Sequence, residues 1–125
     1  GVVTLRAAEA LGRMGPAAIP ALVKLLDQRD YSILALQTLE SMGPSARPAS
    51  SKLAELLQGA DEAPKRSLCL AIAAIGADPK IAGPALKRVL ADEQSTARPA
   101  AAYALGRIGD HTAIKDLTNA IEAED

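Results

Sequence analysis

The chain has 125 residues, which is enough for one compact domain with a core of its own. Hydrophobic residues make up 49% of it, but there is no Trp, no Phe and only two Tyr, so the core must consist of Leu, Ile, Val and Ala, and the abundance of Leu and Ala favours helices. The 14 basic and 15 acidic residues give a net charge of −1, which argues against a protein dedicated to binding polyanions.

An internal repeat is the main signal in the sequence. Four glycines, each preceded by an apolar residue, are spaced by 28, 33 and 33 residues: Gly15, Gly43, Gly76 and Gly109. The residues one, four and eight positions before each glycine fall on one stripe of a helix and are apolar: Met14, Leu11 and Ala7; Met42, Leu39 and Ala35; Ile75, Ile72 and Leu68; Ile108, Leu105 and Ala101. Each segment therefore predicts a first helix that ends at a glycine, where a positive φ is tolerated.

A second helix is predicted after each glycine. Proline suits the first turn of a helix and aspartate caps it, which places the starts near Pro16, Pro44, Pro79 and Asp110. Apolar triplets at i, i+3, i+4 spacing follow: Leu22/Leu25/Leu26, Leu53/Leu56/Leu57, Leu86/Val89/Leu90 and Leu117/Ala120/Ile121. We expect eight helices in four repeats of a single domain, at approximately residues 1–29, 30–60, 61–93 and 94–125.

An all-α, right-handed solenoid accounts for this pattern better than a closed four-helix bundle. A bundle needs fewer and longer helices and gives no reason for a period near 33 residues. In a solenoid the small residues let neighbouring helices approach closely: Ala7, Ala8, Ala35, Ala101 and Ala102. The same interpretation predicts nearly full burial of four apolar side chains: Leu22, Leu56, Leu105 and Ile121.

Residues 5–15 (LRAAEALGRMG) and residues 98–109 (RPAAAYALGRIG) resemble the HEAT-like repeats first described in phycobilin lyases. The resemblance covers essentially the whole chain. Repeat two departs from the pattern with Leu36 and Thr38 at small-residue positions, and repeat three has Ile72-Ala73 in place of Leu-Gly. The resemblance implies an α-solenoid, a fold used by scaffolds, adaptors and a few enzymes.

The enzymes that the resemblance suggests need residues that are scarce in this sequence. Phycobilin lyase chemistry requires aromatic side chains to grip a bilin, and the chain has two tyrosines. Deoxyhypusine hydroxylase, which resembles this fold, holds two irons through several His ligands, whereas His111 is the only histidine here. We expect His111 to be an exposed first-turn residue, and we expect no catalysis, no cofactor and no bound metal.

Cys69 is the only cysteine, so no disulfide can form within the chain. It lies beside the buried stripe of its helix and is expected to be a small core residue rather than a nucleophile. No apolar run approaches the roughly 18 residues that a membrane span needs. The compartment stays open, with the cytoplasm slightly favoured.

Binding to another protein or peptide is the function that we expect. The resemblance to HEAT-like stacks implies that the second helices line the concave side of the solenoid. Six polar residues are then expected to form a ladder along it: Lys24, Asp27, Glu55, Gln58, Arg88 and Asn119. Their mixed charges suit a protein surface better than a phosphate backbone. The first helices carry Leu34, Leu70 and Tyr103 on their outward side, where we expect contact with adjacent repeats.

Two alternative functions stay open. HEAT-like DNA glycosylases hold DNA on a basic surface, and the cluster of Lys80, Lys87 and Arg88 allows a nucleic-acid-binding module. The second alternative is an accessory subunit related to phycobilin lyases.

The first helix opens with apolar residues and no polar capping segment: Val2, Val3 and Leu5. Solenoids need terminal repeats with a polar outer face. We therefore expect that the chain belongs to a longer array, or that its N-terminal repeat docks on a partner or a second copy.

Overall fold

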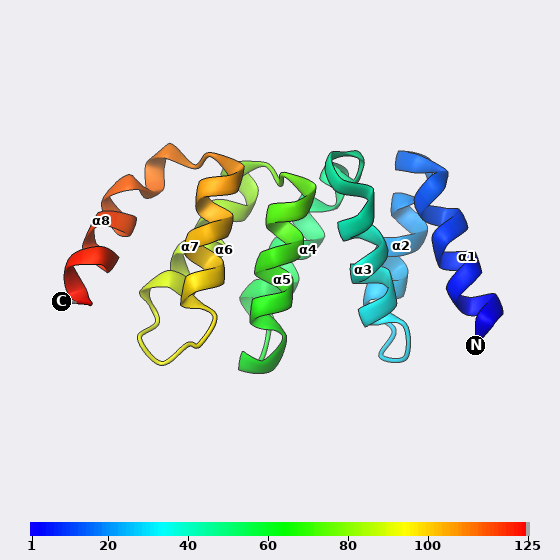
Figure 1. The fold of residues 1–125 in the computed structure, drawn as a ribbon, viewed down its shortest axis with the longest axis horizontal. Helices are drawn as coiled ribbons and strands as arrows, with labels where there is room; N and C mark the ends of the chain where they lie inside the picture. The colour runs from blue at the N-terminus through cyan, green and yellow to red at the C-terminus, as the bar shows by residue number, and fades with distance from the viewer. Residues whose placement is uncertain (125) are drawn as a thin grey trace.

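A computed structural model describes residues 1–124, which form eight α-helices, three short 3₁₀ segments and no strand (Figure 1). The α-helices are α1 (Val2–Arg13), α2 (Ile19–Leu26), α3 (Ser32–Met42), α4 (Ser50–Gly59), α5 (Glu62–Ile75), α6 (Pro79–Ala91), α7 (Arg98–Ile108) and α8 (Ile114–Ala123). The 3₁₀ segments are η1 (Gly15–Ala18), η2 (Gly43–Ala49) and η3 (His111–Ala113). The predicted all-α solenoid is confirmed.

The helices stand in two rows. The first helices α1, α3, α5 and α7 form the row nearer the viewer in Figure 1, and the second helices α2, α4, α6 and α8 form the row behind. Each first helix packs on the next one in its row, and α2, α4 and α6 pack on the first helix of the following repeat. This arrangement is the stacking that buries a face no single hairpin could bury alone.

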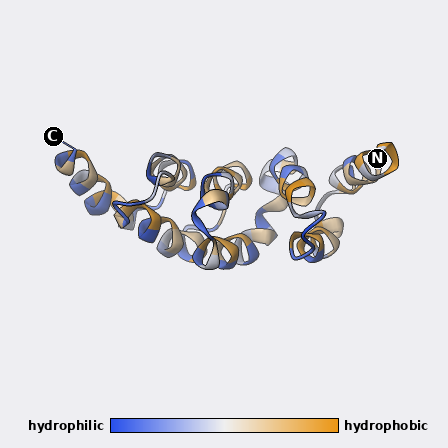
Figure 2. Ribbon diagram, turned by 90° about the horizontal axis from the view of Figure 1, so that it is seen from below, coloured by the Kyte–Doolittle hydropathy of each residue, from blue (hydrophilic) through white to orange (hydrophobic). Residues whose placement is uncertain are grey.

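The stack is a shallow arc, and the first helices lie on its inner side (Figure 2). The expectation that the second helices line the concave side is therefore wrong. The pattern of a single helix marks its apolar face but not the side of the stack on which its row lies. Both rows bury small and large side chains: α5 of the first row buries Leu68 and Ala71, and α6 of the second row buries Ala82 and Leu86.

The four glycines between first and second helices have the backbone conformation that the sequence predicts. All four repeat glycines have a positive φ of 60° to 74°. Gly76 and Gly109 adopt the left-handed conformation that ends α5 and α7. Asp78 and Asp110 cap the segments that follow, because each side chain accepts a hydrogen bond from the backbone N–H two residues later.

One predicted boundary is wrong. The helix expected near Pro44 begins six residues later, at Ser50. Residues 43–49 form a 3₁₀ segment that contains a second proline, Pro48. Proline has no N–H to donate and restricts the residue before it, so the α-helical ladder starts only after Pro48.

The core is continuous along the stack and contains leucine, isoleucine, valine, alanine and Cys69. The predicted burial of Leu22 and Leu105 is confirmed, but Leu56 is only half-buried and Ile121 is 73% exposed. Ile121 lies on α8, which buries none of its residues, since among residues 1–124 α8 packs mainly on α6 and η3. A helical stripe indicates which face is apolar, and a neighbouring element decides whether that face is covered.

Candidate functional site

The six residues of the predicted ladder are all exposed, and they lie on the second helices and their ends, in the outer row. Two of them meet at one basic side chain, since Lys52 Nζ lies 2.7 Å from Asp27 Oδ1 and 3.9 Å from Glu55 Oε1. Within residues 1–124 no hydrogen bond or ion pair joins the side chains of the other four: Lys24, Gln58, Arg88 and Asn119. The six residues thus lie along the outer row, and only Asp27 and Glu55 are joined, through Lys52.

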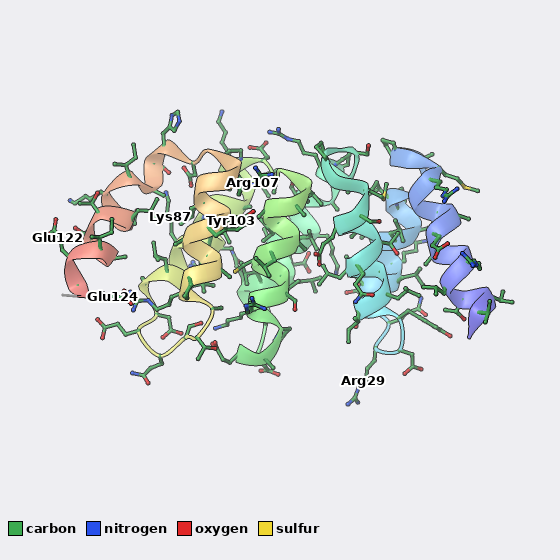
Figure 3. All side chains as sticks on the ribbon, viewed as in Figure 1. Arg29, Lys87, Tyr103, Arg107, Glu122 and Glu124 are labelled. Carbon is green, nitrogen blue, oxygen red and sulfur yellow. The ribbon has the colours of Figure 1, made fainter. Side chains whose placement is uncertain are left out.

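The inner face carries the first helices and a different set of side chains. Leu34 and Leu70 are half-buried, as expected for residues in contact with adjacent repeats. Tyr103 differs from that expectation because 55% of its surface is open to solvent. Tyr103 and Arg107 lie together on α7, along the edge that faces α5 (Figure 3). Tyrosine and arginine are enriched among the residues that contribute most to protein interfaces.

A groove of about 1040 Å³ runs between the α2–α3 pair and the α4–α5 pair. We call it the α3–α5 groove. Its floor and walls contain six larger apolar residues: Leu26, Ile33, Leu36, Leu56, Pro64 and Leu68. Leu26 and Leu68 belong to the core, whereas Ile33 is 72% exposed. The groove is open to solvent and has the size of a site for a ligand or a short peptide segment.

Charged side chains also line the α3–α5 groove: Asp27, Glu40, Glu55 and Asp61 are acidic, and Lys52 is basic. The hydrogen bond to Asp27 raises the pKa of Lys52, so the ammonium stays charged beside its carboxylate. Burial raises the pKa of Glu40 above its ordinary value, because water stabilises that carboxylate less than a fully exposed one. The electrostatic character of the groove is acidic.

The groove exists because the residues that could fill it are small: Ser32, Gly59, Ala60, Ala63 and Ser67. At the next junction in the stack, between α5 and α7, a longer side chain bridges α5 and the α6–α7 link. Glu62 of α5 accepts hydrogen bonds from Ser95 Oγ at 2.9 Å and from Thr96 N at 2.9 Å. These bonds lower the pKa of Glu62 and tie the α6–α7 link to α5.

The side chains considered for chemistry have ordinary surroundings. Cys69 is buried, as predicted for a core residue, and burial raises the pKa of its thiol to about 11. At neutral pH it is therefore a thiol and not the thiolate that nucleophilic catalysis needs. His111 is exposed at the start of η3, as predicted. Across the described part of the chain, no three His, Cys, Asp or Glu side chains gather where they could hold a metal ion.

The predicted basic cluster is partly neutralised. Lys87 Nζ lies 3.8 Å from Asp110 Oδ2 and donates a hydrogen bond to Thr112 Oγ1. Lys80 and Arg88 remain exposed. Among the helices of residues 1–124, none combines the length and apolarity that crossing a membrane requires.

The sequence interpretation missed Ile33, Glu40, Leu56 and Asp61 as parts of one surface. Ile33 and Glu40 lie on α3, Leu56 lies on α4, and Asp61 precedes α5, with no pattern in the sequence that connects them. The groove forms only where α3, α4 and α5 pack together. The one local signal was the group of small residues Gly59, Ala60 and Ala63, which leaves space unfilled by side chains where α4 is linked to α5.

Comparison with known proteins identifies the repeats. Residues 50–125, from α4 to the end of the chain, match HEAT repeats. Residues 5–28, which cover most of α1 and all of α2, match the PBS lyase HEAT-like repeat. No curated protein and no solved structure matches the chain. The HEAT-repeat match extends over more than half of the sequence, and the chain belongs to the HEAT-repeat family.

Proposed function

We propose that this chain is a protein-interaction scaffold without catalytic activity of its own. The observation that carries the proposal is the α3–α5 groove, where exposed Ile33 and half-buried Leu56 lie beside carboxylates. A patch with an apolar centre and a charged rim has the character of a protein-binding surface. The family supports the same function, because HEAT repeats form helical scaffolds that commonly mediate protein interactions.

Residues predicted from the sequence enter this proposal in two ways. Asp27 and Glu55 belong to the groove and form part of the proposed binding surface. Lys24, Gln58, Arg88 and Asn119 lie elsewhere on the outer row, and we propose them as a secondary surface for larger partners. Their substitution should affect binding less than substitution in the groove, because they lie outside it.

Binding to nucleic acid has less support. Phosphate groups that entered the α3–α5 groove would meet the carboxylates of Glu40 and Asp61. The basic cluster offers only Lys80 and Arg88 as unpaired cations within the described residues, since Lys87 is engaged by Asp110. A relation to phycobilin lyases is supported by the match of residues 5–28 alone.

Site-specific photo-crosslinking tests the proposal. A photoreactive amino acid replaces Ile33 in the groove or, as a matched control, Ile114, an exposed isoleucine of α8 outside it. Each chain is then exposed to light in cells that express it. A discrete protein adduct at position 33 and none at position 114 is the expected result. Equal labelling at both positions, or adducts with nucleic acid, would contradict the proposal.

A further inference from the structure

The chemistry of the α3–α5 groove also indicates what kind of partner it takes. The groove combines an exposed apolar surface with four carboxylates and a single ammonium group. The ammonium of Lys52 is already engaged, 2.7 Å from Asp27 and 3.9 Å from Glu55. It therefore neutralises charge at the α2 side of the groove. The other two carboxylates of the groove are Glu40 and Asp61.

Glu40 lies on α3, half-buried, on the groove side of the helix. Within residues 1–124 its carboxylate takes part in no ion pair and no side-chain hydrogen bond. A carboxylate that has lost part of its hydration without gaining a partner destabilises the folded protein. A cation placed beside Glu40 would offset that cost.

Asp61 precedes α5 at the other end of the groove. It occupies the cap position of the helix, yet its side chain accepts no hydrogen bond from the helix N-terminus. The carboxylate is exposed and faces the same hollow as Glu40. The groove thus offers two acidic groups, Glu40 and Asp61, that have no cationic partner among residues 1–124.

Three apolar side chains lie beside these carboxylates in the groove. Ile33 is 72% exposed, and Leu36 and Leu56 are half-buried beside it. Covering such side chains with another apolar group gains about 25 cal/mol per Å² of surface removed from water. The charges at the rim then select among apolar partners, because a like charge against Glu40 would be repelled.

We propose that the α3–α5 groove binds a basic amphipathic segment of a partner protein, with apolar side chains on Ile33 and Leu56 and a Lys or Arg beside Glu40. This assignment rests on the proposed scaffold function and adds the chemistry of the partner. A peptide with leucines on one face and lysines on the other is the simplest molecule of this kind. An acidic peptide with the same leucines would bring like charges together at Glu40 and Asp61.

Fluorescence anisotropy with three labelled peptides of equal length tests the assignment. All three share the same leucines, and their polar positions are Lys, Glu or Gln. The full chain should bind the Lys peptide, and affinity should fall as salt is raised, because charge contacts at a surface are screened. Replacing Glu40 by Gln should weaken binding by roughly fivefold, the change expected for a contact of about 1 kcal/mol. Ile33→Ser should weaken it by a similar factor.

The matched controls are Glu93→Gln, in the α6–α7 link, and Ile114→Ser, on α8; both residues are exposed and lie outside the groove. Neither should change the affinity for the Lys peptide. Equal binding of the Glu and Lys peptides, or an unchanged affinity for Glu40→Gln, would overturn the assignment. So would absence of binding by all three peptides. If photo-crosslinking at position 33 still captures a protein, only the partner chemistry is wrong; if that also fails, the scaffold function falls with it.

Discussion

Two glycines inside helices should respond in opposite ways to the same substitution. Gly83 lies in α6 and Gly106 in α7. Beside Gly106 a new Cβ would meet no atom within 4 Å. Beside Gly83 it would overlap the Oδ2 atom of Asp110 and lie 3.2 Å from Asp110 Cγ. The absence of a side chain at Gly83 is what lets the buried Asp110 carboxylate fit against α6.

The magnitude follows from what Asp110 does. Its Oδ1 atom accepts hydrogen bonds from the backbone N–H and the hydroxyl of Thr112 and so caps η3, and its Oδ2 atom lies 3.8 Å from Lys87 Nζ. Forcing it aside costs about 1–3 kcal/mol for overpacking and about 0.5–2 kcal/mol if the cap is lost. Alanine returns only about 1 kcal/mol of helix propensity. With both costs, Gly83→Ala should lower the free energy of unfolding by about 0.5–4 kcal/mol. Gly106→Ala, in the last turn of α7, should raise it by up to about 1 kcal/mol.

Thermal and urea unfolding followed by circular dichroism measure both effects. For a chain of this size 1 kcal/mol corresponds to about 3–5 °C in Tm, so the two variants should differ visibly in sign. A double-mutant cycle tests whether contact with Asp110 causes the loss of stability. In an Asp110→Ala background the overlap is absent, and Gly83→Ala should no longer destabilise the chain. If Gly83→Ala is as stable as Gly106→Ala in the original chain, the close contact between α6 and Asp110 is wrong.

Three further predictions concern the core and two carboxylates. Leu53→Ala, in the centre of the core, should cost about 2–5 kcal/mol in urea unfolding, and Lys24→Ala at the exposed outer row should change stability by no more than about 0.5 kcal/mol; equal losses would contradict the burial pattern. Because hydrogen bonds lower the pKa of Glu62, its contribution to stability is present above pH 4.5 and is lost as pH falls through the folded-state pKa. The free energy of unfolding of Glu62→Ala should therefore fall less steeply with decreasing pH than that of the parent chain. Identical pH profiles for the two chains would count against these hydrogen bonds. Because burial raises the pKa of Glu40, its favourable contribution to stability is present below pH 4.5 and is lost as pH rises through the folded-state pKa. At pH 7 the free energy of unfolding of Glu40→Gln should therefore be at least as high as that of the parent chain in urea unfolding. A markedly lower free energy of unfolding at pH 7 would refute the desolvation argument.

The sequence predicted the features that depend on local chemistry. The ends of α5 and α7 at Gly76 and Gly109 follow from the need for a positive φ, which the glycine itself satisfies. The caps at Asp78 and Asp110 follow from hydrogen bonds that span two residues. Such features are readable because every group involved is adjacent in the chain.

Features that depend on distant elements were not readable in the same way. The direction of curvature depends on how the two rows of helices pack together, and the local pattern of α2 or α4 does not specify it. Burial of Ile121 needs a covering neighbour that its own helix cannot specify. The α3–α5 groove depends on small residues from the ends of three helices, so neither Ile33 nor Glu40 stands out before the helices are assembled.

Hydrogen exchange of the full chain with and without the leucine–lysine peptide tests the central claim, that the α3–α5 groove is the docking surface. The account predicts slower exchange on peptide binding in the first two turns of α3 and at the α4–α5 link, which border the groove, and unchanged exchange in α8. Protection confined to α8, or spread evenly along the stack, would contradict it.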